Sequence, residues 1–138
     1  MKALIGTCVL AVVAQGLGSC PGSGTTVRLV NDANYRVDVQ LFYDDDQELP
    51  KELIELDGEE VNMTVLAGQT RSFTRSCEDL QAIFIKDADL RAPGDDPEEE
   101  TDAYREPDDF GCGDTITFTF TQNITATDLD IHFSSSAP

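Results

Sequence analysis

The sequence lacks several of the residues on which common protein activities depend. It has no Trp and a single His, and only nine Lys and Arg stand against 27 Asp and Glu, which gives a formal net charge of −18. This charge excludes a nucleic-acid binder that neutralises phosphates, because the protein would repel the backbone it had to approach. With so little His, and with no glycine-rich phosphate loop or Gly-x-Ser-x-Gly elbow, the sequence fits few catalytic designs.

No apolar run is long enough to span a membrane, but a shorter one opens the chain. Lys2 precedes an almost unbroken apolar run from Ala3 to Ala14, whereas a spanning helix needs about 20 residues. A positive start, a short apolar stretch and small residues after it are typical of an export signal. The sequence therefore predicts an exported protein, and the remaining length allows one ordinary domain.

A short motif follows the apolar run. Leu17-Gly18-Ser19-Cys20 resembles the lipobox of bacterial lipoproteins. In that family the Cys is diacylated on its sulfur, the signal is cut just before it, and the new amino terminus is usually acylated as well. The resemblance implies that residues 1–19 are a signal peptide and that Cys20 carries the lipid. The alternative is simple secretion, with cleavage after Gly16 or Gly18.

The number of cysteines supports lipidation independently. Cys8 lies inside the apolar run and leaves with the signal, so the mature chain keeps Cys20, Cys77 and Cys112. An odd thiol in an exported protein calls for an explanation, which lipidation of Cys20 supplies. Because export favours oxidation, the two remaining thiols predict a structural disulfide between Cys77 and Cys112.

Residues 20–26 are expected to hold the lipidated Cys and a tether. The sequence Pro21-Gly22-Ser23-Gly24-Thr25 has the composition of a flexible coil. Loss of Lys2 with the signal leaves eight basic residues against 27 acidic ones, and none of them is near the anchor. The lipid must therefore hold the protein to the membrane without electrostatic help, which requires more than one acyl chain. We expect the protein on the periplasmic or cell-surface side of a membrane.

The rest of the chain, residues 27–134, is expected to be a single acidic domain built from strands. Apolar residues recur with a period of two in six short segments, 27–29, 35–43, 61–65, 71–77, 115–121 and 129–133, and a seventh segment, 82–85, is continuously apolar, as a central strand would be. Such segments, separated by turn residues, predict an all-β antiparallel β-sandwich that is immunoglobulin-like or fibronectin-like. One helix is expected over 50–56 as a crossover between the sheets, with Leu49, Leu53 and Leu56 on one face.

An acidic loop, residues 87–111, raises the question of a cation site. Calcium takes six to eight oxygen ligands, many from carboxylates. The EF-hand spacing does not fit, because Arg91 and Ala92 occupy positions that need a ligand and a Gly. A calcium site built from sandwich loops and a solvated, mobile segment that aids solubility both stay open. We favour the second, so no cofactor is expected; the candidate metal ligands are Asp87, Asp89, Asp95, Asp96, Asp108 and Asp109.

Two further patterns are interpreted as structural features without a functional role. His132 lies between Ile131 and Phe133, so strand alternation turns it toward solvent and away from any catalytic role. Thr alternates with apolar residues over 115–121, which could suggest a flat surface for ice or sugar. A single strand makes no flat array, and Thr is favoured on exposed strand faces. We therefore expect an ordinary solvent-facing strand.

These observations predict a lipid-anchored binding or structural module of the cell envelope with no catalytic activity, similar to small exported lipoproteins. The first alternative is a calcium-dependent adhesion or recognition module that uses the acidic loop. A carboxylate-based hydrolase is a more distant alternative, because 27 acids will always contain some pair and no Trp is present to form a sugar platform. The expected partners are the membrane, through the lipid, and an envelope protein or polysaccharide, with no nucleic acid.

Overall fold

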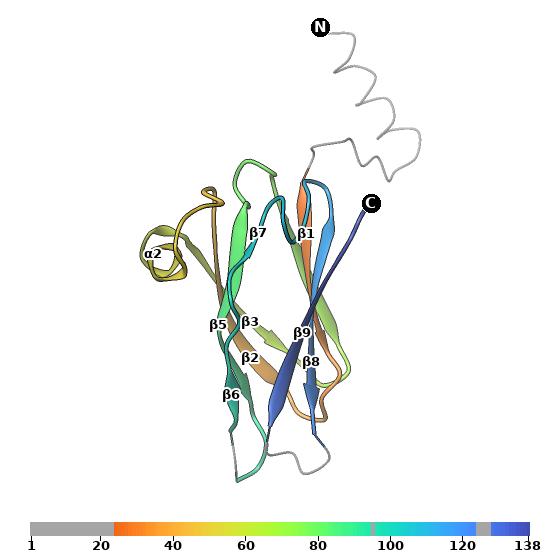
Figure 1. The fold of residues 1–138 in the computed structure, drawn as a ribbon. Helices are drawn as coiled ribbons and strands as arrows, with labels where there is room; N and C mark the ends of the chain where they lie inside the picture. The colour runs from red at the N-terminus through yellow and green to blue at the C-terminus, as the bar shows by residue number, and fades with distance from the viewer. Residues whose placement is uncertain (1–23, 95, 124–127) are drawn as a thin grey trace, which may run out of the picture.

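Two β-sheets face one another and make up nearly the whole domain in a computed structural model, which describes residues 24–94, 96–123 and 128–138 (Figure 1). The expected signal peptide and Cys20 lie outside the described residues. The elements, in chain order, are β1 (Thr25–Asn31), β2 (Val37–Asp44), α2 (Lys51–Asp57), β3 (Glu59–Val65), β4 (Thr70–Arg75), β5 (Ala82–Leu90), β6 (Glu98–Glu99), β7 (Tyr104–Arg105), β8 (Thr115–Gln122) and β9 (Leu129–Ser136).

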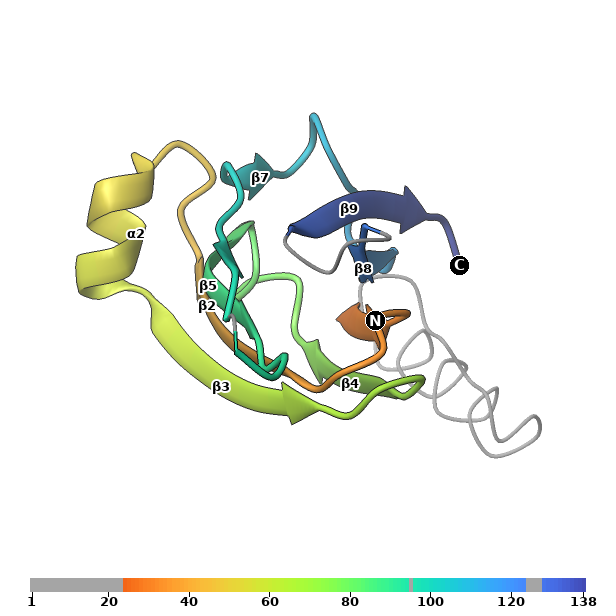
Figure 2. The ribbon, with the colours of Figure 1, turned by 90° about the horizontal axis from the view of Figure 1, so that it is seen from below.

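One sheet has the strand order β4-β1-β8-β9, and the other has the order β3-β2-β5-β6, with β7 also paired to β5 (Figure 2). Every pairing is antiparallel except that of β1 with β8, which is parallel. The predicted all-β sandwich is therefore confirmed. Each of the seven long strands overlaps one of the seven predicted segments, and the two-residue strands β6 and β7 are additional.

The core lies between the sheets and is built from alternate side chains of the facing strands. Val27, Leu41 and Phe118 are among the residues with no exposed surface. Because successive side chains of a strand point to opposite faces, each buried residue leaves its neighbours on an outer face. Aromatic stacking closes one side of the sandwich, where the Tyr104 ring of β7 lies 3.7 Å from the Phe133 ring of β9.

A β-bulge in β5 changes which residues face the core. Leu41 of β2 pairs with Ile85, whereas the preceding Gln40 pairs with Asp87, so Lys86 is left over. Odd-numbered residues of β5 are core residues before the bulge and even-numbered ones after it. An extra residue in one strand shifts the alternation in this way. The bulge therefore turns Asp87 and Asp89 outward.

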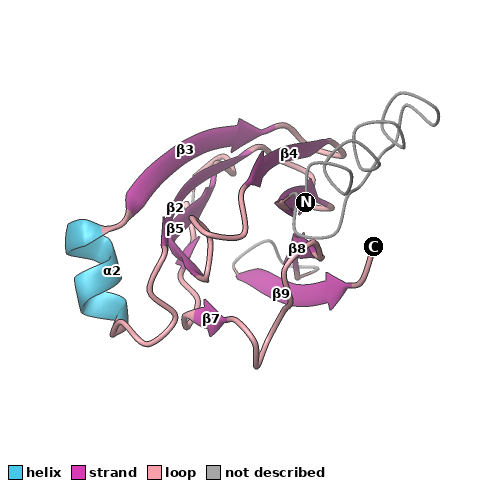
Figure 3. Ribbon diagram, turned by 90° about the horizontal axis from the view of Figure 1, so that it is seen from above, coloured by secondary structure: helices cyan, strands magenta, loops and turns pink. Residues whose placement is uncertain are grey.

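The helix α2 confirms the helix expected over 50–56, but two details of that prediction are wrong. It connects β2 to β3, which are neighbours in one sheet, so it is no crossover between sheets (Figure 3). Its buried residue is Ile54, which packs on Phe42 and Phe84 on the outer face of β2 and β5. Leu53 and Leu56 are 41% and 77% exposed. In the part of the chain that the structure describes, no helix has the length and apolar character needed to cross a membrane.

The acidic segment 87–111 is partly sheet, in contrast to the loop that we expected. Its first residues continue β5 to Leu90, and β6 and β7 pair back onto that strand. The Thr101 side chain is buried and accepts a hydrogen bond from the Ile85 amide at 2.9 Å. Phe110 belongs to the core. Apolar and hydroxyl side chains within the segment therefore hold it to the sandwich despite its charge.

Candidate functional site

The chain joins the sandwich at Gly24, four positions after the predicted lipidation site Cys20. Gly24 lies so close to β4 that a Cβ atom there would come within 2.9 Å of the Thr74 side chain and 3.0 Å of the Arg75 carbonyl oxygen. A side chain at this position would require β4 to shift. The start of β1 is therefore packed directly against its neighbouring strand.

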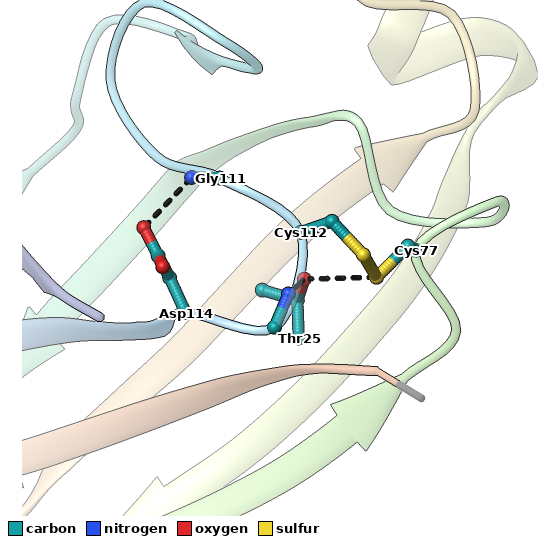
Figure 4. Close-up of a disulfide and its surroundings, with 6 residues drawn as sticks. Thr25, Cys77, Gly111, Cys112 and Asp114 are labelled. Atoms are coloured by element: carbon teal, nitrogen blue, oxygen red, sulfur yellow. Dashed lines mark hydrogen bonds between the residues drawn. A yellow bond between two sulfur atoms is a disulfide. The ribbon is translucent and has the colours of Figure 1, made fainter. Parts of the chain in front are cut away.

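The predicted disulfide is present and lies beside the start of β1. Cys77 and Cys112 are bonded, with their Cα atoms 5.3 Å apart. The Thr25 hydroxyl is 3.9 Å from the Cys77 sulfur and accepts a hydrogen bond from the Gly113 amide at 3.3 Å (Figure 4). Thr25 itself is fully buried. The disulfide thus fixes two loops around the first residue of the first strand.

Asp114, which immediately precedes β8, connects the turn that carries Cys112 to the neighbouring strands. Its carboxylate accepts hydrogen bonds from the Gly111 amide at 2.7 Å (Figure 4) and from the Ser135 hydroxyl at 3.0 Å. Its backbone oxygen accepts the Thr26 amide at 3.1 Å. The turn that carries Cys112 is therefore bonded to β1 and β9 as well as to Cys77.

The predicted metal ligands fall into separate places. Asp87 and Asp89 lie together on the outer face of β5, while Asp95 lies outside the described residues. Asp96 is 3.5 Å from the Arg91 guanidinium.

Asp108 and Asp109 belong to the turn after β7, at the other end of β5. The Asp109 carboxylate accepts the Arg105 amide at 2.8 Å, and Arg105 pairs with Ala82. Five residues of strand, about 16 Å, separate Ala82 from Asp87. Asp109 therefore makes a local turn contact and does not join the group around Asp87.

A third carboxylate completes a group with Asp87 and Asp89. Glu98 of β6 pairs with Asp89, and one carboxylate oxygen from each of the three residues lies within 4.8 Å of the others. We did not expect Glu98 among the ligands, because its place depends on β6 folding back onto β5. Three oxygens at this spacing match part of the ligand shell of a hard cation such as calcium, with Ca–O distances of about 2.3–2.6 Å.

Like charges affect the titration of this group. The pKa of Asp87 is raised, first by burial and then by the charge of Asp89. The pKa of Glu98 is also raised, first by a hydrogen bond shared with Asp89 and then by the charges of Asp89 and Asp87. One oxygen of Asp89, Oδ1, is buried with no hydrogen-bond partner. Asp87 and Glu98 therefore bind protons more readily than isolated carboxyl groups would.

Arg91 supplies positive charge beside the group. Its Nε donates to Asp38 Oδ2 at 2.8 Å, and its Nη2 lies 3.9 Å from Asp89. Burial opposes ionisation of Asp38, but the hydrogen bonds from Arg91 and the Thr64 hydroxyl outweigh it and hold the Asp38 pKa below its usual value. Arg91 therefore pairs most closely with Asp38 and more distantly with Asp89.

A shallow hollow of about 370 Å³ covers this part of the outer face, lined mainly by polar side chains of β2, β3 and β5. Asp38, Asp87 and Asp89 are among the lining residues. The hollow suits a cation or a polar surface group, since an apolar ligand needs apolar walls. His132 lies on the outer face of the other sheet, where it is exposed and contacts the Thr121 hydroxyl at 3.2 Å. The single histidine is therefore remote from the acidic group, and its predicted solvent-facing position is confirmed.

Comparison with known proteins finds no family model and no curated sequence that matches this chain. Among solved structures, one that is similar is a protein from Eubacterium rectale, at 13% identity and a TM-score of 0.47, with 79% of this chain and 88% of that chain covered. Another is the T6SS lipoprotein TssJ1 from Pseudomonas aeruginosa, at 13% identity and a TM-score of 0.44, with 86% of this chain and 100% of that chain covered. At this level of similarity, function has to be argued from the residues of this chain.

Proposed function

We propose that this protein is an exported, non-catalytic module of the cell envelope, held at a membrane by a lipid on Cys20. The observation that carries the proposal is the Cys77–Cys112 disulfide. Disulfides persist in oxidising compartments, which supports export. The disulfide also uses two of the three cysteines that follow the signal, and the third is the lipobox Cys20.

Replacement of Cys20 tests the anchor. The full chain is expressed in a bacterial host, and its membrane attachment is measured by flotation of membranes on a density gradient. Cys20→Ala should move the protein from the floating fraction to the soluble exported fraction. Cys8→Ala is the matched control, because Cys8 leaves with the signal and its replacement should change nothing. Unchanged flotation of Cys20→Ala would contradict the proposal.

Binding or structural support of an envelope protein or polysaccharide is the role that best fits the domain. The hollow between β2, β3 and β5 is polar and open, whereas small-molecule sites are mostly enclosed and apolar. The acidic residues point out from a rigid sheet, which suits contact with the surface of another molecule. A panel of polysaccharide substrates should therefore show no hydrolysis by the purified protein.

Calcium-dependent recognition is the second candidate, and the grouping of Asp87, Asp89 and Glu98 favours it. A bound ion would relieve the repulsion between the three carboxylates. The melting temperature should then rise by several degrees at millimolar calcium and return with EDTA. Asp89→Asn should abolish the rise, and Asp108→Asn, outside the group, should retain it. A melting temperature indifferent to calcium would exclude this candidate.

A further inference from the structure

The outer face of the β4-β1-β8-β9 sheet carries mostly hydroxyl side chains. The register places Thr26 opposite both Thr74 and Thr115, and the hydroxyls of Thr26 and Thr74 are 3.1 Å apart. The same pattern repeats along the strands in three rows of four residues, which we call the hydroxyl face: Thr74, Thr26, Thr115, Ser136; Ser72, Arg28, Thr117, Ser134; and Thr70, Val30, Thr119, His132. The threonines of one strand thus belong to an array across four strands.

The outer faces of the two sheets differ in charge. On the sheet that carries the hydroxyl face, only Arg28 and Asp130 point outward, so this outer face has no net formal charge. Arg71 and Arg75 lie on the inner side of β4, where they donate hydrogen bonds to the Thr64 carbonyl and the Tyr43 hydroxyl. The strands of the opposite sheet contain eight carboxylates against Lys86 and Arg105, a formal charge of −6. In a chain with a net charge of −18, the sheet that carries the hydroxyl face is an exception. The preference of Thr for strands does not by itself explain its shortage of carboxylates.

Arg28 lies in the middle row of the hydroxyl face with Ser72 on one side and Thr117 on the other. It is exposed. Within residues 24–94, 96–123 and 128–138, every other Lys and Arg has a hydrogen bond, ion pair or ring contact, whereas Arg28 has none. An unpaired guanidinium flanked by hydroxyls is well suited to an anionic group such as a phosphate.

The position of the anchor limits which surface can approach a membrane. Four residues separate Cys20 from Thr25, so an extended chain reaches at most about 18 Å. The end of the sandwich at which β1 starts also carries the loops that the disulfide joins. Those loops hold six carboxylates, Glu78, Asp79, Glu106, Asp108, Asp109 and Asp114. An anionic membrane surface would repel this end of the sandwich, and it would also repel the acidic β3-β2-β5-β6 sheet.

We propose that the hydroxyl face is the surface that this domain turns toward the phospholipid headgroups of the leaflet that holds its anchor. The inference rests on the proposed lipidation of Cys20. Phosphate oxygens accept hydrogen bonds from Arg28 and from the surrounding hydroxyls, and an anionic leaflet repels the strands of the opposite sheet, with a formal charge of −6, more than it repels the hydroxyl face. Polybasic segments that bind membranes contain more basic residues than this face. The face therefore sets the orientation of a domain that the lipid retains.

Fluorescence quenching from the headgroup region tests this orientation. The lipidated full chain is reconstituted into vesicles of phosphatidylethanolamine and phosphatidylglycerol that contain a headgroup nitroxide lipid. One added cysteine carries the fluorophore, either Ser134→Cys on the hydroxyl face or Asn62→Cys on the outer face of β3. The nitroxide should quench position 134 several-fold more than position 62. Equal or reversed quenching would overturn the proposal. The hydroxyl face would then be a candidate surface for a protein partner.

Charge reversal supplies the second arm of the test. Arg28→Glu should bring the ratio of quenching at positions 134 and 62 close to one, and Arg28→Gln, which preserves the size of the side chain, should lower it in the same direction. Arg36→Glu is the matched control, because Arg36 is exposed on another part of the surface and its reversal changes the net charge equally. It should leave the ratio as it is. If Arg28→Glu left the quenching ratio unchanged, or if Arg36→Glu changed it equally, the role of the face would be refuted.

Flotation of the labelled protein separates this inference from the proposed function. Loss of flotation in the wild-type chain would refute both, since there would be no anchored state to orient. Flotation with equal quenching at the two positions would refute the orientation alone and would leave lipidation intact.

Discussion

Removal of the disulfide should weaken the domain by an amount that follows from the size of the loop it closes. Cys77 and Cys112 are 35 positions apart, and the loop between them contains β5, β6 and β7. Closing a loop of this length lowers the entropy of the unfolded chain by an amount worth about 4 kcal/mol at 25 °C. For a domain of this size, 1 kcal/mol corresponds to about 4 °C, so Cys77→Ala with Cys112→Ala should lower the melting temperature by about 15 °C.

The measurement is thermal unfolding of the full chain, followed by circular dichroism, for the wild type and the double variant. A reducing agent should lower the melting temperature of the wild type by a similar amount and leave the double variant unaffected. Hydrogen exchange should also show faster exchange of the Thr26 amide, whose acceptor is Asp114 in the turn next to Cys112. A loss below about 4 °C, equivalent to about 1 kcal/mol, would refute the reasoning from loop closure.

Three further predictions concern single residues. Asn31→Ala removes a buried side chain that makes three hydrogen bonds to backbone groups, so it should cost about 3 kcal/mol in chemical denaturation, whereas Asn34→Ala, on the exposed neighbouring turn, should cost little. Deletion of Lys86 removes the extra residue of the bulge and leaves Ile85, Asp87 and Ala88 in unbroken alternation opposite β2. The deletion variant should therefore fold, as judged by near-UV circular dichroism, and loss of the folded spectrum would contradict the assigned register. Glu98→Gln should stabilise the domain at pH 7, since a raised pKa means that the charged carboxyl is unfavourable in the folded state. That gain is present above the folded pKa and should vanish below the ordinary value of 4.5; a gain that persists at low pH would contradict this cause.

The strands could be predicted because the strongest signal in this sequence is the alternation of apolar and polar residues. Residues such as Ile116, Phe118 and Phe120 alternate with threonines, and each of the three is fully buried. Burial of one face requires such a period in any exposed sheet. The disulfide could also be predicted, since only two thiols remained to pair.

The details that depend on pairing between strands could not be predicted. A bulge at Lys86 has no local sequence signal, yet it decides that Asp87 and Asp89 point outward. Glu98 joins them only because β6 pairs with β5. The helix face was also misassigned, since Leu56 looked as apolar as Ile54 and only the position of the sheet decides which side is covered.

The hydroxyl face is a third feature of this kind. The threonines of β8 were visible in the sequence, but their neighbours in space come from residues up to 90 positions earlier. Parallel pairing of β1 with β8 places Arg28 beside Thr117. No pattern within one segment indicates that these hydroxyls form a continuous surface.

Intact-mass analysis of the protein extracted from membranes tests the anchor most directly. Lipidation predicts a chain that begins at Cys20 and is heavier than the polypeptide by its acyl groups, with Cys77 and Cys112 resistant to alkylation until they are reduced. An unmodified polypeptide that begins at Ser19 or earlier would contradict it.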